Sequence, residues 1–492
     1  MSHKKIVVIG SGFAGLATAA LLAKEGHEVT VLEKNSSIGG RARHFSENGF
    51  TFDMGPSWYW MPDVFENFFG LFGKKVSDYY ELKKLSPSYT INFGEGNTMF
   101  VPDTMEGIFA LFESKEPGAG AKIKQFLTVA EEKYNISMND LVYKPSLSIT
   151  EFVNLTMLKS LFRMKLFISF SKYVRQSFTH PDLLRLLEFP ILFLGATPQN
   201  TPALYSIMNH AGLTQGTWYP MGGMRRIPEA LESLSLSLGV KIATDQAVTK
   251  IQVEQGKTTG VFTEDGFYPA DAVVAACDYA HTEQKLLEPQ YRNYNSNYWD
   301  TRVLAPSALI FYVGLNTRVQ NVEHHTLFFD EDFGVHAEEI YTEPKWPQKP
   351  LFYLCCPSVS DPTVAPEGKE NLFVLIPVAS GLEDSEEMRE KYFNMVVDRM
   401  ESYYGQDIRN HIEYMRSYCV KDFQEDYNAL RGNAYGLANT LTQTAVLKPR
   451  IRNKKVSNLF YAGQLTVPGP GVPPSLISAQ IAAKLIQNYF KK

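Results

Sequence analysis

The chain has few cysteines and no excess of positive charge, and each shortage disfavours a class of protein. Its 492 residues include four cysteines. That number is too small for a disulfide framework in a chain of this length, so a reducing cytosol is expected. Lysine and arginine total 48 against 53 acidic residues, which gives a net charge of −5. Nucleic-acid binders typically carry a basic excess, so no nucleic-acid partner is expected.

Long hydrophobic runs are also missing. No stretch of 18 or more apolar residues occurs, so the sequence predicts no membrane-spanning helix. The apolar N-terminal region is interrupted by Gly10, Gly12 and Gly15, and no cleavage-site pattern follows it, so no secretory signal is expected. These features predict a cytoplasmic protein. A hydrophobic content of 44% is ordinary for a globular chain of two or three domains.

The clearest pattern is a βαβ unit at the N-terminus. Residues 4–10 and 28–33 read as buried strands, and residues 13–25 read as a helix. The segment Gly10-Ser11-Gly12-Phe13-Ala14-Gly15 matches the GxGxxG fingerprint between the first strand and the helix. The first glycine permits a tight turn, the second lets a pyrophosphate approach, and the third lets the helix lie close to the sheet. This context predicts a dinucleotide site.

Two further segments favour FAD over a nicotinamide cofactor. Glu33 ends the second strand, where its carboxylate can accept both ribose hydroxyls and repel a 2′-phosphate. Gly39-Gly40-Arg41 follows and suits a second pyrophosphate contact. Near the C-terminus, residues 459–463 read as a strand ending in glycine, followed by Pro468–Ser475 and a helix at 474–490. The positive end of that helix would face the flavin edge that becomes anionic on reduction.

The rest of the chain predicts a second domain interleaved with the first. Residues 105–190 are mostly helical in character, 239–277 and 303–377 are rich in strand patterns, and 384–404 reads as a helix. No long polar linker separates these parts, which favours interleaved domains.

Several motifs together resemble the carotenoid desaturase family of FAD-dependent oxidoreductases, especially bacterial phytoene desaturases. They are Gly10–Gly15 with Glu33, Gly39-Gly40-Arg41, Phe52–Ser57, Thr217–Met224, Asp361–Gly368, Tyr461-Ala462-Gly463 and Pro468–Ser475. The likeness covers essentially the whole chain. The first glycine set is shared by many flavoenzymes, whereas the later motifs are more specific. One departure is Pro473-Pro474, where family members often have glycine after the first proline.

The resemblance implies an α/β fold, with a Rossmann-like FAD-binding domain interleaved with a mixed-sheet substrate domain and a helical membrane-contact region. The predicted FAD domain comprises residues 1–75, 218–285 and 455–492, and the substrate domain 76–217 and 286–454. The predicted FAD-binding residues are Gly10, Gly12, Phe13, Ala14, Gly15, Glu33, Lys34, Gly40, Arg41, Gly55, Pro56, Ser57, Val248, Gly463, Val472 and Pro473.

The implied reaction is desaturation of a linear carotenoid precursor, phytoene in the first place. The flavin N5 would take a hydride, and the neighbouring carbon would lose a proton. No Ser-His-Asp pattern and no catalytic carboxylate pair are evident, and the sequence identifies no general base. Trp58 and Trp60 are candidate substrate-lining residues, and Phe189–Leu194 is a second candidate lining. Ordinary core packing is the alternative for both.

The expected partners are a hydrophobic polyene, a membrane surface bound peripherally, and quinone or oxygen as electron acceptor. Residues 151–176 carry five basic residues against one acid, Glu151, which suits anionic head groups. Helical core with solvated lysines explains the same segment. No metal site is predicted, because no cysteine or acid lies at a helical ligand spacing from His324-His325.

Other functions remain open at this stage. The same fold would suit a C30 polyene or hydroxycarotenoid desaturase, a polyene isomerase or saturase, or an amine oxidase. A non-catalytic prenyl-binding protein is the alternative outside the enzymes. No cysteine lies in the C-terminal flavin segment to tether the cofactor, as amine oxidases often do.

Overall fold

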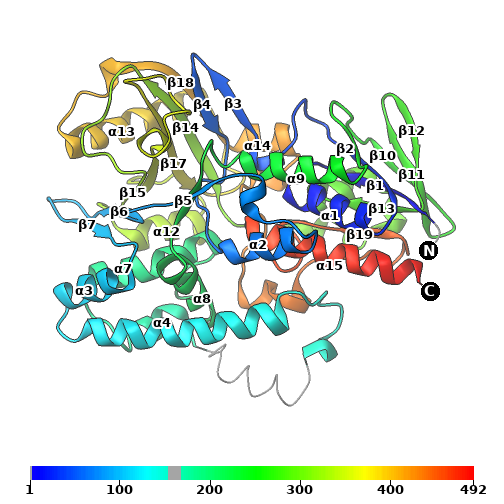
Figure 1. Cartoon of the computed structure of the whole chain (residues 1–492), viewed down its shortest axis with the longest axis horizontal. Coiled ribbons are helices and arrows are strands. Elements are labelled where there is room, and N and C mark those ends of the chain that lie inside the picture. The colour runs from blue at the N-terminus through cyan, green and yellow to red at the C-terminus, as the bar shows by residue number, and fades with distance from the viewer. Residues whose placement is uncertain (1–2, 153–167, 492) are drawn as a thin grey trace.

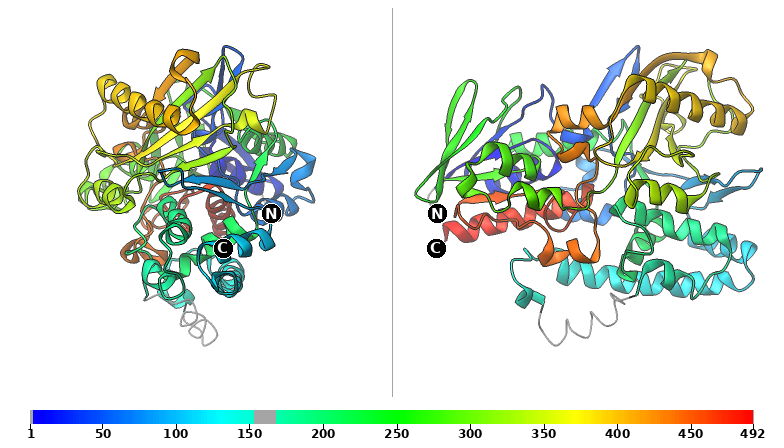
Figure 2. Two further views of the ribbon diagram at one scale, coloured as in Figure 1. Left: turned by 90° about the vertical axis from the view of Figure 1, so that its left-hand side faces the viewer. Right: turned by 180° about the vertical axis from the view of Figure 1, so that it is seen from behind.

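A computed structural model describes residues 3–152 and 168–491 of the chain. Two sheets lie toward opposite ends of the long axis, joined by helices and loops (Figure 1). The N-terminal and C-terminal segments lie side by side at one end, as the views from two directions show (Figure 2). The chain crosses between the two halves more than once, so each half is built from segments that are not consecutive in the sequence.

The first sheet is parallel, with the strand order β19-β13-β1-β2-β9. Its central strands are apolar and buried, as expected for a parallel sheet covered on both faces. Helix α1 packs against the C-terminal helix α15 and against α9. The bounds are β1 Lys5–Ile9, α1 Phe13–Lys24, β2 Glu28–Leu32, α9 Arg226–Ser237, β9 Lys241–Ala243, β13 Ala272–Ala275, β19 Leu459–Tyr461 and α15 Val472–Phe490.

These elements confirm the predicted N-terminal βαβ unit and the predicted strand and helix at the C-terminus. Helix α15 begins two residues earlier than predicted, because Pro473 and Pro474 occupy its first turn, where a missing N–H costs nothing. The strand patterns and turn signals within residues 239–277 correspond in part to an antiparallel three-stranded sheet. Its strands are β10 Lys250–Glu254, β11 Lys257–Thr263 and β12 Gly266–Pro269.

The second sheet has seven strands in the order β18-β14-β17-β16-β15-β6-β7. It is mixed, because β15 runs parallel to β6 while its other pairs are antiparallel. All nine residues of β14 are buried, so both faces of the sheet are covered. The bounds are β6 Tyr89–Asn92, β7 Thr98–Val101, β14 Ser307–Leu315, β15 His325–Phe328, β16 Phe352–Cys355, β17 Glu370–Val378 and β18 Ile412–Tyr418.

Different elements cover the two faces of this second sheet. One face packs against α13 Glu386–Tyr404 through a cluster that includes Phe311, Tyr392 and Val396. The other face packs against helices between residues 105 and 194 and against β3 His44–Glu47 and β4 Phe50–Asp53. The strands of the first sheet come from within the three segments predicted for the FAD domain, and those of the second from within the predicted substrate domain. The domain boundaries themselves stay a prediction.

The helical region lies beside the second sheet (Figure 1). It contains α3 Met105–Lys115, α4 Ala119–Ile136, η3 Ser137–Leu141, η4 Ile149–Phe152, α6 Phe170–Val174, α7 Pro181–Glu188 and η5 Phe189–Leu194. The helical character predicted for residues 105–190 is confirmed over the described part. Lys159, Arg163 and Lys165 of the predicted membrane segment lie outside the described residues. Within residues 3–152 and 168–491, no helix has the length and apolar character needed to cross a bilayer.

The fold is completed by shorter elements, of which η1, β4 and β8 overlap motifs found in the sequence. They are η1 Gly40–Ala42, β3 His44–Glu47, β4 Phe50–Asp53, α2 Pro62–Gly70, η2 Val76–Asp78, β5 Leu82–Lys84, η6 Ala203–Ser206, α8 Ile207–Asn209, η7 His210–Thr214, β8 Trp218–Pro220, α10 Tyr279–His281, η8 Thr282–Leu286, η9 Pro289–Tyr291, α11 Ser296–Asp300, α12 Phe333–Tyr341, η10 Pro357–Val359, η11 Arg409–His411, α14 Val420–Tyr427, η12 Leu430–Gly432, η13 Leu441–Gln443 and η14 Ala445–Leu447.

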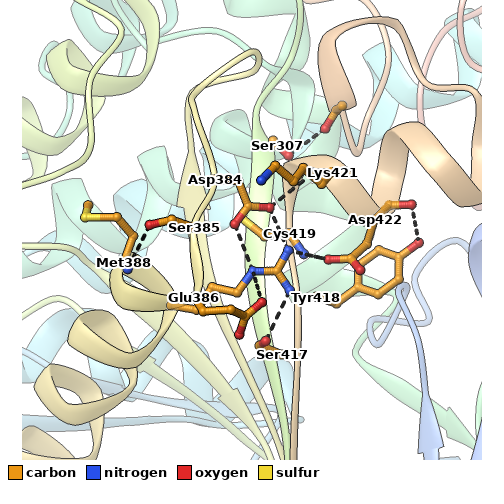
Figure 3. A network of polar contacts seen from close by, with 12 residues as sticks. Ser307, Asp384, Ser385, Glu386, Met388, Ser417, Tyr418, Cys419, Lys421 and Asp422 are labelled. Carbon is orange, nitrogen blue, oxygen red and sulfur yellow. Dashed lines mark hydrogen bonds and ion pairs between the residues drawn. The ribbon is translucent and has the colours of Figure 1, made fainter.

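A buried polar network fixes α13 and α14 to the second sheet (Figure 3). The Arg389 guanidinium donates to Asp384 at 2.6 Å and to Asp422 at 2.7 Å. Burial alone would lower the pKa of Arg389, but its contacts with Asp384 and Asp422 raise it above its ordinary value. Tyr418 donates to Asp426 at 2.8 Å, and Asp426 lines the groove described below. The network therefore extends from α13 to the edge of the candidate site.

Candidate flavin site

A groove lies at the carboxyl ends of the first sheet's strands. This is where open parallel α/β sheets bind nucleotides. The predicted cofactor residues that line the groove are Gly10, Gly12, Phe13, Ala14, Glu33, Lys34, Gly40, Arg41, Val248 and Gly463. Segments from the start, middle and end of the chain thus meet at one surface.

The glycine turn shows a separate structural reason for each glycine. Gly10 has φ +98°, and its N–H donates to the Leu32 carbonyl at 2.8 Å. A Cβ on Gly15 would lie 1.9 Å from the Gly10 carbonyl oxygen, so no side chain fits there. A Cβ on Gly12 would meet nothing closer than the Gly40 Cα at 3.9 Å. The protein itself therefore leaves room for a side chain at Gly12. The absence of a side chain matters for a ligand that approaches the backbone in the groove.

Glu33 is buried at the end of β2 and lines the groove. Its Oε2 accepts hydrogen bonds from the Ser11 N–H and the Ser11 hydroxyl, both at 2.8 Å. Its Oε1 accepts from the Asn35 N–H at 3.0 Å and from the Asn35 side-chain amide at 3.1 Å. The carboxylate is thus held rigidly against the glycine turn. These four bonds use the roughly four acceptor positions of a carboxylate. A ribose hydroxyl would therefore take the place of one of the two side-chain donors, the Ser11 hydroxyl or the Asn35 amide.

Arg41 contributes a cation to the same groove. Its guanidinium carbon lies 5.1 Å from the centre of the Tyr427 ring, and its Nη2 donates to the Asn433 carbonyl at 3.2 Å. Burial lowers the pKa of Arg41, while the charge of Asp278 acts in the opposite direction. Its Nε is buried without a hydrogen-bond partner among the described residues. A donor of this kind suits a phosphate oxygen.

Six predicted cofactor residues do not line this groove: Gly15, Gly55, Pro56, Ser57, Val472 and Pro473. Gly15 packs under the glycine turn, and Val472 and Pro473 form the first turn of α15. Ser475, in the same turn, does reach the groove. A Cβ on Gly55 would lie 2.4 Å from the Arg41 carbonyl oxygen, so Gly55 packs directly behind the Gly39-Gly40-Arg41 turn. Ser57 lines a separate small cavity with Asp53 and Cys355.

Three of the motifs shared with the family are connected by hydrogen bonds in the structure. Asp53 accepts from the backbone N–H groups of Met224 at 2.7 Å and Arg225 at 3.0 Å. Burial raises the pKa of Asp53 to about 6, although both backbone bonds act to lower it. Asp361 accepts from the Gly222 N–H at 2.5 Å and from the Thr363 hydroxyl at 2.6 Å. These carboxylates therefore hold together three segments that are far apart in sequence.

Trp58 and Trp60 lie in the aromatic cluster between the second sheet and the helical region. Trp58 stacks on His325 with ring centres 4.2 Å apart, and it contacts Trp60 edge-on at 5.3 Å. The Trp60 indole N–H donates to the Thr217 hydroxyl at 3.0 Å. Phe189, from the second predicted lining segment, contacts both rings. The two candidate linings thus form one apolar cluster, and the choice between lining and core stays open.

A cysteine joins the histidine pair, which spacing along the sequence did not predict. His325 on β15 is paired in register with Cys355 on β16, because the two strands are antiparallel neighbours. One ligand atom from each of His324, His325 and Cys355 lies within 4.8 Å of the others, and all three residues are buried. His324 Nδ1 contacts the Ser360 hydroxyl at 2.8 Å, and His325 Nδ1 contacts the Tyr353 hydroxyl at 2.7 Å. These atoms could hold a metal ion, because strand pairing and not helical spacing brings the cysteine to the histidines.

Other groove residues carried no signal in the sequence. Asp278, Tyr279 and His281 follow β13, and Asp426, Tyr427 and Asn428 lie at the C-terminal end of α14. They reach the groove through tertiary packing, because β13 adjoins β1 in the sheet. Only the rule that nucleotides bind beyond the carboxyl ends of parallel strands would have located the first group.

The residues present fit an FAD. The groove combines open backbone at Gly12, a fixed carboxylate at Glu33 and an unsatisfied guanidinium N–H at Arg41. These are the features that a pyrophosphate and a ribose require. Helix α15 begins beside the far end of the groove, so its positive end can act on the flavin ring.

Comparisons with known proteins agree with this reading. Residues 13–487 match the family described as flavin-containing amine oxidoreductase. A carotenoid 3,4-desaturase from Haloarcula japonica is 41% identical over 99% of this chain and 98% of its own. A zeta-carotene-forming phytoene desaturase from Myxococcus xanthus is 31% identical over 99% of this chain and 94% of its own. The solved structure of cyclohexylamine oxidase from Brevibacterium oxydans has the same fold, with 15% identity, a TM-score of 0.61 and 100% of both chains covered.

The matches extend over nearly the whole chain, as the resemblance in its motifs indicated. They establish FAD as the cofactor and an oxidoreductase acting on CH–CH groups as the class of enzyme. The chain belongs to the flavin-containing amine oxidoreductases, as a member of the carotenoid desaturase family.

Proposed function

We propose that this protein introduces a double bond into a linear carotenoid at its FAD site. The observation that carries the proposal is the 41% identity, over almost the full length of both chains, to a carotenoid 3,4-desaturase. The large apolar cluster around Trp58, Trp60 and Phe189 supports it, because a hydrocarbon polyene needs a dry, aromatic surrounding rather than charged partners.

The FAD, when bound, supplies the acceptor for a hydride taken from a substrate carbon. The protein's own residues bind and orient the two reactants. Glu33, Arg41 and the glycine turn hold the nucleotide end. The neighbouring carbon loses a proton, and its bonding electrons form the new double bond. Conjugation with the existing polyene stabilises the positive charge that develops, and the apolar surrounding excludes water from it.

Two positions of desaturation are supported by different relatives. The 3,4-desaturase is the more similar of the two relatives compared, which favours a bond at the 3,4 position of an already conjugated carotenoid. The relative from Myxococcus xanthus, at 31% identity, supports phytoene as the second candidate substrate, the one predicted from the motifs. Both belong to one reaction class, so the chemistry at the flavin is the same.

Parallel assays with the two substrates separate these candidates. The FAD-loaded protein is incubated in liposomes with phytoene or with lycopene, in the presence of a quinone or of oxygen. A product from lycopene that absorbs at longer wavelength and has lost two hydrogens supports the 3,4 position. A product series from phytoene alone supports the second candidate. Conversion of neither substrate, together with hydrogen peroxide formation from a simple amine, would overturn the proposal in favour of an amine oxidase.

We also propose peripheral attachment to the cytoplasmic face of a membrane, where a polyene substrate would reside. The support is the basic excess of residues 151–176, of which Lys172 is an exposed member in the described part. Neutralising Lys159, Arg163, Lys165 and Lys172 should weaken binding to anionic vesicles by roughly 1 kcal/mol per charge. Unchanged vesicle binding would contradict this attachment. The electron acceptor in that setting is a quinone or oxygen.

A further inference from the structure

Lys448 is a buried lysine that the site described so far does not use. It follows η14 and is 3% exposed. Its Nζ has no hydrogen-bond partner among the described residues, and neither has the side-chain oxygen of Asn439, which is 4% exposed. Leaving two such groups unsatisfied in the interior is costly. An arrangement of this kind indicates that something else satisfies them.

Both groups face the turn that leads into α15. A Cβ on Gly469 would lie 3.4 Å from Lys448 Nζ and 3.1 Å from Asn439 Oδ1. Gly469 belongs to the turn of residues 468–471, directly before the first residue of α15. The same segment borders the groove: Thr466 lines it and donates to the carbonyl of Pro449, the residue after Lys448, at 2.7 Å. Lys448 is not among the residues that line the groove, but it lies directly behind the segment that borders the groove at the end where the flavin ring is expected.

No fixed counter-ion explains the buried amine. Burial lowers the pKa of Lys448 to about 7, and it is the sole cause of that shift. The carboxylates that line the groove, Glu33, Asp278 and Asp426, do not contribute to it. Helix α15, which packs beyond the turn, carries one charged residue, Lys484, three turns from its start. Residues 439–447 carry no charge. An anion arriving beside Lys448 would therefore meet no competing partner and would favour its charged form.

We infer that Lys448 takes up a proton when the bound flavin is reduced, and that its ammonium, with Asn439 accepting one of its N–H groups, balances the charge of the reduced ring. The reduced flavin is the anion that the established cofactor supplies at this place. In the proposed desaturation the balance is complete: the hydride carries two electrons and one proton to the flavin, and the second proton from the substrate is held on Lys448. Transfer of the electron pair and both protons to a quinone or oxygen restores the starting state.

This inference rests on the FAD site and not on the identity of the polyene, so it is tested without substrate. The FAD-loaded protein is titrated with dithionite against reference dyes between pH 6 and 9, and the midpoint potential of the flavin is plotted against pH. For a two-electron couple each coupled proton contributes about 30 mV per pH unit. Above pH 7 the parent protein should show about 60 mV per pH unit, because Lys448 is neutral beside the oxidised flavin and charged beside the reduced one.

Two variants of Lys448 distinguish the effect of its positive charge on the flavin potential from the effect of its proton uptake. Lys448→Met should show about 30 mV per pH unit and a lower potential, since the compensating charge is lost. Lys448→Arg should show the same shallow slope with a higher potential than the methionine variant, because its charge is permanent. Lys133→Met is a matched control: Lys133 is also buried, but its Nζ donates to the Ala203 carbonyl at 3.2 Å and to the Ser206 hydroxyl at 3.0 Å. That control should keep the steep slope of the parent.

The outcomes that contradict the inference are specific. A shallow slope in the parent, or a steep slope in Lys448→Arg, would show that the proton goes elsewhere. If Lys448→Met does not retain FAD, the arginine variant carries the test, because it keeps the charge and most of the side-chain volume. Failure of every polyene assay would leave these potentials unaffected, so the inference and the proposed function fail separately.

Discussion

The two halves of this molecule offer different kinds of surface to the ligands proposed for them. The nucleotide half offers mainly backbone groups, from a glycine turn and a helix start, together with one fixed side-chain carboxylate. All of these lie within the first 33 residues. The half proposed to hold the substrate offers side chains from separate segments, such as Trp58, Phe189 and His325, packed into one cluster. A polar ligand with a fixed shape needs a few exact donors, whereas a flexible hydrocarbon needs an extended apolar surface. Substitutions in the two halves should therefore separate FAD binding from turnover.

The largest effect should come from Gly12→Val. The protein itself tolerates a side chain at this position, because a Cβ there would meet nothing closer than 3.9 Å. The pyrophosphate, however, would lose its approach to the backbone. We expect a folded protein with almost no bound flavin, measured as the ratio of FAD to protein after purification. Gly70→Val in α2, where a Cβ meets nothing within 4 Å, is the control and should retain FAD. Full flavin content in Gly12→Val would mean that the groove does not hold the cofactor.

Glu33→Ala should weaken FAD binding by a smaller amount. The substitution removes charge-assisted hydrogen bonds worth roughly 1.5–3 kcal/mol, which corresponds to an increase in Kd of roughly 10- to 150-fold. The fixed position of the carboxylate against Ser11 makes the loss difficult to compensate. Fluorescence titration of the FAD-free protein measures it. Glu28→Ala on the exposed start of the same strand should leave Kd unchanged, and an equal loss in both variants would point to general destabilisation.

The nucleotide half could be predicted from the sequence because its parts are local. Strand, turn, helix and carboxylate follow one another, so spacing alone placed Gly10, Gly12 and Glu33 at one site. Asp278 and Asp426 reach the same groove from distant segments, and no spacing marks them. The register of β15 with β16, which brings Cys355 to His325, depends on sheet pairing that a single sequence does not specify. Asp53 and Asp361, in two of the desaturase motifs, accept hydrogen bonds from backbone N–H groups of a distant segment and so hold the segments together.

Trp58→Ala should lower turnover more than it changes FAD binding. The ring lies in the aromatic cluster and is absent from the groove lining. Loss of its contacts with a polyene should reduce the desaturation rate on the order of tenfold, with flavin content unchanged. Trp60→Ala tests the same cluster, but it is 7% exposed, and truncating such a residue costs about 3–5 kcal/mol of stability. Trp58→Phe is the matched control. A parallel loss of flavin and turnover would remove the distinction between the halves.

An effect that involves neither FAD binding nor turnover should appear in the pH dependence of stability. Burial raises the pKa of Asp53 to about 6 from an ordinary value of 3.8. The unfolded chain therefore loses this proton first as the pH rises, and the contribution of Asp53 to stability falls between pH 4 and 6. Asp53→Asn should flatten this part of the curve of unfolding free energy against pH. Its joint with Met224 and Arg225 would also loosen. An unchanged slope in the variant would contradict the assignment of this titration to Asp53.

The most direct test of the central claim is an anaerobic single-turnover experiment with a linear carotenoid. The FAD-loaded protein is mixed with lycopene or phytoene in liposomes without any electron acceptor, and the flavin and polyene absorption bands are followed together. The account predicts that the flavin band bleaches while the polyene band moves to longer wavelength, with one new double bond formed per flavin reduced. Bleaching without a change in the polyene, or no bleaching with either carotenoid while a simple amine reduces the flavin, would contradict it.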